Sequence, residues 1–271
     1  MASYTKTQRK SAQDQTQEEG IQLLQRMISQ EHMLQEDIWA APVEVLDLHL
    51  PQSSLSAKSK PSAVKDAAAL AWANARNSFL NAQSMHALAK DGMFPSIHIQ
   101  RPLSLPIFGT RSTKDDAWIA PWRAEFLDTY KKVNTAVASG DKKALKALTT
   151  DAYQASAQAR LRAYHPHTPG PYPTTYKWKL HQLNAPVRVE SIRAIQGHYG
   201  LQEPKTGSRL LVHALVRFES TQTLHVYGRN GALIKDQGQP VPKPVKEFLV
   251  FEKRMWYDGP WMIKDQFYED A

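Results

Sequence analysis

The chain has 271 residues, which suits one or two domains, and its lack of cysteine excludes disulfide bonds, thiol catalysis and cysteine metal sites. Its formal charge of +8 is uneven, because residues 1–60 carry six basic and eight acidic groups and the remainder carries a net charge of +10. A basic folded region favours a polyanionic partner or an anionic membrane surface. No apolar run reaches the roughly 18 residues that a membrane-spanning helix requires.

The first 60 residues are predicted to be an N-terminal extension that is only partly helical. Residues 1–16 are polar and are expected to be disordered. Apolar residues at helical spacing predict one short helix over 17–38. Residues 40–62 are bounded by prolines and are predicted to be an extended linker.

The next region, residues 61–114, is predicted to combine one long helix with an irregular segment. The helix is expected over 62–90, with Ser62 placed to cap it. Its apolar stripe consists of Val64, Ala68, Trp72, Ala75 and Phe79. Three prolines make residues 92–116 an irregular crossing segment.

Two more helices are predicted between Trp118 and Tyr164. The first has an apolar stripe formed by Phe126, Tyr130, Val133 and Val137. Gly140 ends this helix, because glycine tolerates the positive φ of a helix end. Asp141 is expected to cap the second helix, which continues to Tyr164 with Leu145, Leu148 and Ala152 on one side.

From Thr174 the period of the apolar pattern changes from helical to alternating, which predicts strands. They are expected near 174–181, 187–196, 209–227, 245–257 and 261–268. One face of the third strand consists of Leu210, Val212, Ala214, Val216 and Phe218. Helices followed by strands predict an α+β domain in which helices pack on a curved antiparallel sheet.

The segment "EFLDTYKKVNTAVASGDKKALKALTTDAY" resembles the start of the Tim-forty-four-like domain family, in which a helix ends at a Gly-Asp step before a second helix. The later segment "TLHVYGRNGALIKDQGQPVPKPVKEFLVFEKRMWYDGPWMIKD" is similar to one branch of that family. This branch includes a protein of the mitochondrial large ribosomal subunit and the fungal inner-membrane receptor for mitoribosomes. The resemblance covers about residues 115–268, within a domain that we place at 115–271.

The resemblance implies a cone-shaped fold like that of nuclear transport factor two and a function without catalysis. It implies a place in the mitochondrial matrix, on the large ribosomal subunit near the peptide exit, where the protein tethers the ribosome to the inner membrane for co-translational insertion. The implied partners are ribosomal RNA, large-subunit proteins, the membrane surface and the insertion machinery, without a cofactor or small-molecule substrate. Two alternatives stay open: a peripheral import-motor subunit of the inner-membrane translocase, and an enzyme built on the cone fold.

Basic side chains on the predicted helices and the first strand are candidates for binding ribosomal RNA, since Lys and Arg neutralise phosphates. They are Lys131, Lys132, Lys142, Lys143, Lys146, Arg160, Arg162, Lys177 and Lys179. Lys142 and Lys146 are neighbours at helical spacing, so phosphates can bridge them. The alternative for each residue alone is an ordinary solvated face.

Trp118 and Trp122 flank the sequence "IAP" just before a predicted helix. They are candidates either for a hydrophobic staple or for contact with a membrane or partner. Trp178 and Trp261 alternate with charged neighbours and are expected to pack in the core.

Few residues offer metal or acid–base chemistry. His165 and His167 lack a nearby third ligand, so we expect no metal site there. We find no acid placed beside His213, which is expected to be a hydrogen-bonded histidine rather than a base. Glu247 and Glu252 fall on opposite sides of their strand and therefore cannot form a carboxylate pair.

Overall fold

The computed structural model describes residues 43–50, 63–95, 97–164, 175–199, 203–228, 233 and 241–268. One structural unit spans residues 45–198 and 202–271. Its elements are α2 (Ala63–Lys90), the 3-10 helix η1 (Leu105–Arg111), α3 (Ala120–Ser139), α4 (Lys142–Leu148), α5 (Asp151–Tyr164), β1 (Thr175–Leu183), β2 (Arg188–Gln196), β3 (Leu210–Tyr227), β4 (Lys243–Arg254) and β5 (Met262–Phe267). The predicted α+β class and all five predicted strands are confirmed.

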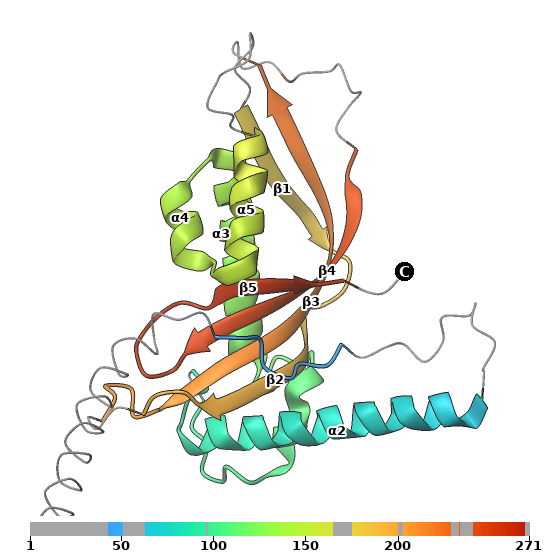
Figure 1. Cartoon of the computed structure of the whole chain (residues 1–271), viewed down its shortest axis with the longest axis vertical. Coiled ribbons are helices and arrows are strands. Elements are labelled where there is room, and N and C mark those ends of the chain that lie inside the picture. The colour runs from blue at the N-terminus through green and yellow to red at the C-terminus, as the bar shows by residue number, and fades with distance from the viewer. Residues whose placement is uncertain are drawn as a thin grey trace, which may run out of the picture. The chain divides into compact units, whose positions relative to one another are not determined.

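The sheet is antiparallel and is organised around the 18-residue strand β3 (Figure 1). β2 pairs with the first part of β3 and β1 with the second part, so these two strands share one edge of β3. β4 follows the other edge along most of its length, and β5 pairs with β4. Register shifts interrupt β1, β2 and the β4–β5 pair, and such bulges bend and twist a sheet.

The main core lies between one face of this sheet and the helix α3. The predicted stripes of α3 and β3 meet there: Phe126, Tyr130, Val133, Val212, Ala214, Val216 and Phe218 are all at most 1% exposed. Stacking of Tyr130 on Phe218, with ring centroids 4.4 Å apart, joins the two stripes directly. Burial of each large apolar side chain contributes about 1.5–3 kcal/mol, so this seam fixes α3 on the sheet.

The α2 helix is confirmed within one residue, but its predicted apolar stripe is not the face that packs. Trp72 and Phe79 are 73% and 68% exposed. The buried face carries core residues from its second half, Ala82, Met85, Leu88 and Ala89, together with amides and hydroxyls that bond to the edge strand β2. Asn81 Oδ1 accepts the N–H of Ile192 at 2.9 Å, and Ser84 Oγ accepts the N–H of Ala194 at 3.1 Å. Thus α2 covers an otherwise free strand edge.

The single helix predicted from Asp141 to Tyr164 is wrong, because the chain breaks between α4 and α5. Thr149 forms an isolated bridge with Ile263, and the N–H of Thr150 donates to the carbonyl of Ile263 at 2.9 Å. Two β-branched residues thus leave the helix to pair with the sheet. The cap at Asp141 and the positive φ of Gly140, 80°, are confirmed.

The segment 45–50, predicted to be part of a linker, packs instead on the second face of the sheet. Its Val45, Leu48 and Leu50 lie against a small cluster formed by Leu215, Phe248 and Val250. The faces of β3 are therefore both buried, one by helices and one by this segment. The predicted helix over 17–38 and the predicted cap at Ser62 lie outside the described residues.

Candidate anion-binding site

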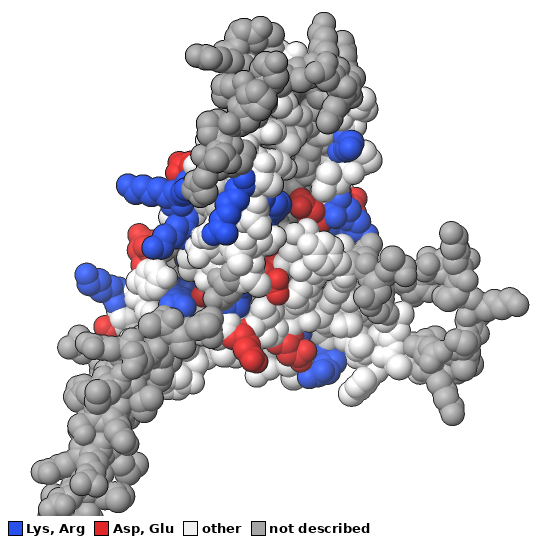
Figure 2. Space-filling model, turned by 45° about the horizontal axis from the view of Figure 1, so that its top comes forward, with Lys and Arg blue, Asp and Glu red and all other residues white. Residues whose placement is uncertain are grey.

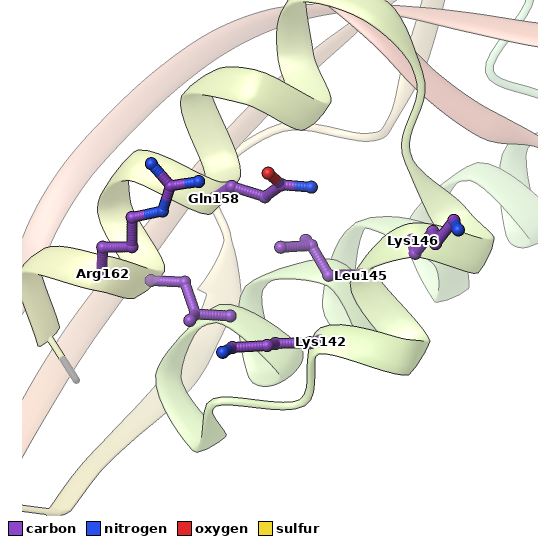
Figure 3. Close-up of a pocket in the computed structure, with 6 residues that line it drawn as sticks. Lys142, Leu145, Lys146, Gln158 and Arg162 are labelled. Carbon is purple, nitrogen blue, oxygen red and sulfur yellow. The ribbon is translucent and has the colours of Figure 1, made fainter. Parts of the chain in front are cut away.

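A pocket of about 270 Å³ lies between α4 and α5 (Figure 3). It is lined by Lys142, Leu145, Lys146, Gln158, Leu161 and Arg162. Leu145 and Leu161 form an apolar floor and are 1% and 3% exposed. The three cations are exposed, so the pocket combines a cationic rim with an apolar base.

The local fold explains why these residues meet. Asp141 caps α4 by accepting the backbone N–H groups of Lys143 and Ala144 at 3.0 and 2.9 Å. Within α4, Lys142 and Lys146 are one turn apart. The break before Asp151 reverses the chain, so that α5 returns beside α4 and adds Arg162.

The electrostatics of the pocket favour an anion. Among the described residues, no carboxylate forms an ion pair with Lys142, Lys146 or Arg162. In contrast, Lys132 on α3 is paired with Asp128 at 2.6 Å. Like charges one helical turn apart repel each other, and a bound anion relieves that repulsion. Figure 2 shows Lys and Arg side chains gathered on the side where α4 and α5 lie in Figure 1.

The other predicted basic residues are not part of this pocket. Lys143 is exposed on the same short helix, and Lys131 is exposed on α3. Lys177 and Lys179 are both exposed on one face of β1, as predicted, and Lys177 lies 5.0 Å above the ring of Tyr227.

Arg160 is placed differently from its neighbour Arg162. Its guanidinium lies 5.2 Å from the ring centre of Tyr153, and two of its nitrogens are buried. Burial raises the pKa of Tyr153, and the adjacent Arg160 opposes that increase. A guanidinium packed on a buried ring contributes to α5 packing, so Arg160 is not available to a phosphate at the surface.

A polar network in the core connects α3 with β3 and β4. The hydroxyl of Tyr130 donates to the carboxylate of Glu247 and accepts from Gln222 Nε2 at 2.5 Å. Trp178 Nε1 donates to Gln222 Oε1 at 2.7 Å. Burial and the nearby Glu247 charge raise the pKa of Tyr130 above its ordinary value. The phenol therefore stays protonated as a hydrogen-bond donor.

His213 has the acidic neighbour that the sequence pattern did not reveal. Its Nε2 is 3.0 Å from Glu252 Oε2, and both residues are at most 1% exposed. Lys264 Nζ lies 3.0 Å from the same oxygen, and Arg254 Nε lies 3.3 Å from the other one. His213 Nδ1 accepts the backbone N–H of Leu46 at 3.0 Å. Both ring nitrogens of His213 and both carboxylate oxygens of Glu252 are thus engaged, which is typical of a structural network.

Glu252 is held as a carboxylate by this cluster. Burial alone would raise its pKa, but the hydrogen bond from His213 and the charge of Lys264 lower it to about 2. With that pKa, Glu252 is ionised near neutrality and has no proton to donate to a substrate. Alternation with the buried Trp261 and Ile263 places Lys264 on the opposite face of the sheet, but no element was predicted to cover that face.

The tryptophans predicted for membrane or partner contact pack inside the unit. Trp122 is 1% exposed and lies between the rings of Phe94 and Trp261, at 4.7 and 5.2 Å. Trp118 is partly buried against the same core, 5.8 Å from Phe94. The contact role predicted for Trp122 is therefore wrong, and packing explains both residues. Trp178 and Trp261 pack against the core, as expected.

His165 and His167 lie outside the described residues. Within the described part of the chain, no group of three His, Cys, Asp or Glu side chains is arranged to hold a metal ion. Likewise, no helix among the described residues is long and apolar enough to cross a bilayer. No protein-family model matches the sequence, and a search of curated proteins finds no match.

Proposed function

We propose that this protein is a non-enzymatic component of the mitochondrial large ribosomal subunit near the peptide exit, where it binds ribosomal RNA and tethers the ribosome to the inner membrane. The observation that carries the proposal is the pocket between α4 and α5, where Lys142, Lys146 and Arg162 stand together without a carboxylate partner among the described residues. The likeness of residues 115–268 to Tim-forty-four-like proteins supports the same function.

We also propose that the α+β unit has the cone shape of domains like nuclear transport factor two. β3 has two successive partners on one edge, and register shifts interrupt both of them. Bulges of this kind increase curvature. A sheet that curves around α3 is the arrangement that such a cone requires.

RNA is the polyanion that this pocket fits best. Phosphate groups are recognised by Lys and Arg side chains that lie within reach of one another, and each neutralised phosphate releases counterions. The apolar floor formed by Leu145 and Leu161 leaves room beside the cations for a ribose or base edge. The net charge of +10 outside the first 60 residues adds long-range attraction to RNA.

The membrane contact rests on a different surface. Large apolar side chains are exposed on α2 and on the segment that follows it: Trp72, Phe79, Leu103, Leu105 and Phe108. Exposed apolar side chains on one part of a basic protein favour an interface with a membrane or a membrane protein. These residues take the role that the sequence assigned to Trp118 and Trp122.

Sucrose-gradient sedimentation of mitochondrial lysate tests the proposal. The tagged protein should migrate with the large subunit, and the triple variant Lys142→Glu, Lys146→Glu and Arg162→Glu should dissociate at lower salt. Loss of three phosphate contacts reduces the slope of log K against log salt by about 2–3. The control variant reverses the charge of three exposed lysines outside the pocket by the substitutions Lys90→Glu, Lys114→Glu and Lys205→Glu. It should migrate like the wild type.

Two results would contradict this proposal. Migration of the triple variant that equals the control at every salt concentration would remove the pocket from the interface. Absence of the wild-type protein from the large subunit at low and high salt would exclude the ribosomal role. The import-motor alternative would then be tested by co-purification with the inner-membrane translocase.

A further inference from the structure

The segment 45–50, hereafter the strap, is bound to the sheet through side chains rather than through a strand ladder. The N–H of Leu46 donates to His213 Nδ1 at 3.0 Å, and the N–H of His49 donates to Ser191 Oγ at 3.3 Å. At a bend at Asp47, the N–H of Leu48 donates to the carbonyl of Leu46 at 2.5 Å. The strap backbone is thus recognised at two positions that are three residues apart.

Apolar contacts alternate with these hydrogen bonds. Val45, Leu48 and Leu50 pack against the cluster that Leu215, Phe248 and Val250 form on the sheet. The sheet residues beneath are at most 5% exposed, whereas the strap side chains are only partly buried. The strap therefore covers this part of the sheet surface, hereafter called the groove, while its own side chains stay partly exposed to solvent.

The polar residues beneath the strap are also bonded to one another. His213 is oriented by Glu252, which in turn is bound by Lys264 and Arg254, and all four belong to β3, β4 and β5. Because His213 Nδ1 accepts the N–H of Leu46, its Nε2 carries the hydrogen that bonds Glu252. The network thereby fixes an acceptor that points out of the sheet. A preorganised acceptor beside an apolar surface is what peptide recognition requires.

The polar ties between the strap and α2 are weak by comparison. Asp47 pairs with Arg76 at 2.8 Å, but both side chains are more than 60% exposed, and such pairs contribute little in water. His49 Nε2 is 3.2 Å from Asn74 Oδ1. The apolar contacts and the two backbone hydrogen bonds therefore provide most of the binding, and any peptide with the same pattern can supply them.

We propose that this face of the sheet is a docking groove for an extended aliphatic segment of a partner protein, and that the strap occupies it as an internal competitor. The partner segment has aliphatic side chains at the positions of Val45, Leu48 and Leu50 and free backbone N–H groups at the positions of Leu46 and His49. The strap is part of the same chain, so its effective concentration at the groove is in the millimolar range. A partner binds when its own affinity or local concentration exceeds that of the strap.

The test uses the full-length chain and a fluorescein-labelled peptide with the sequence of residues 43–50, VEVLDLHL. In one variant, Val45→Ser, Leu48→Ser and Leu50→Ser release the strap. The peptide should bind this variant saturably in fluorescence anisotropy and should bind the wild type at least about tenfold more weakly, because the intact strap competes. Glu44→Gln, a change at an adjacent exposed residue, is the matched control and should bind like the wild type.

Methylation of single backbone nitrogens in the peptide distinguishes specific docking from nonspecific hydrophobic binding. A methyl group on the nitrogen equivalent to Leu46 removes the donor to His213 and should weaken binding about tenfold. The same change at the position of Asp47 is the control, since this N–H has no partner among the described residues. Equal affinity of the two methylated peptides, or no binding to a folded strap-released chain, would overturn the proposal.

Hydrogen exchange on the wild-type chain tests the same proposal without the triple variant, which is needed if that variant does not fold. Excess unlabelled peptide should displace the strap and accelerate deuterium uptake in residues 45–50. Unchanged uptake at saturating peptide would overturn the proposal. Light scattering tests whether the strap of a second copy of this chain occupies the groove instead. If the wild-type chain is a dimer that the peptide dissociates, the groove binds that second strap, and the proposed partner is excluded.

Discussion

Replacing Glu252 with glutamine should remove a pH-dependent part of the stability that one buried carboxylate provides. Burial raises the pKa of Glu252, but the hydrogen bond from His213 and the charge of Lys264 outweigh it, so the pKa falls to about 2 from an ordinary value of 4.5. A group whose pKa is lower in the folded state stabilises the fold above its unfolded pKa. This stability is lost as the pH falls from about 4.5 to about 2.

The size of the effect follows from the shift. The difference between 4.5 and about 2 corresponds to about 3 kcal/mol of stability above pH 5, of which about 2 kcal/mol is lost by pH 3. Glu252 is 1% exposed, so solvent screening does not reduce this figure. Urea unfolding of both chains between pH 5 and pH 3 should show the difference in free energy of unfolding narrow by about 2 kcal/mol. Both chains share all their other carboxylates, so the difference between their free energies of unfolding at each pH removes the contribution of those groups.

Glu125→Gln is the matched control for this measurement. The Glu125 carboxylate is 39% exposed and lies 3.8 Å from Lys253 Nζ, so its difference from the wild type should stay constant within about 0.5 kcal/mol. A constant difference for Glu252→Gln over the same pH range would refute the reasoning. It would mean that the cluster does not stabilise the ionised carboxylate.

Two further substitutions test the polar contacts of the core by urea unfolding at pH 7. Tyr130→Phe should lower the free energy of unfolding by about 2 kcal/mol, since it leaves Glu247 without its phenol donor; an unchanged value would show that water replaces the phenol. Asn81→Ala should cost about 2 kcal/mol because the N–H of Ile192 loses its acceptor at the strand edge. Gln83→Ala, an exposed change on the same helix, should cost less than about 0.5 kcal/mol.

The elements that were predicted well are those in which one face is apolar and the other polar. Alternation along β3 identified the face that carries Val212, Ala214 and Val216, and helical spacing identified the buried stripe of α3. In both cases the core lies on the apolar side, so the period of the sequence reports burial directly.

The α2 helix shows where this reasoning fails. Its spacing predicts a helix, but its buried face combines core residues such as Met85 and Leu88 with amides and hydroxyls that bond to the edge of β2. Asn81 and Ser84 are buried because they satisfy backbone donors of another strand, while Trp72 remains exposed. A pattern within one helix does not reveal which strand edge requires a partner.

The cluster around His213 was missed for a related reason. Its members lie on the face of the sheet opposite the helices, and no element was predicted to cover that face. They are buried because residues 45–50 return across the sheet from a position 167 residues earlier in the chain, measured from Leu46 to His213. Contacts at that separation leave no periodic signal in either segment.

The candidate site depends on the one helix that was predicted wrongly. If Asp141–Tyr164 were a single helix, Lys142 and Arg162 would be 20 residues apart along its axis, or about 30 Å. The break at Thr149 and Thr150 reverses the chain, so the two cations line one pocket with Lys146. The sequence therefore identified the right residue types, and pairing of Thr149 with Ile263 of β5 is what brings them together. A substitution that weakened this pairing would separate the cations without removing any of them.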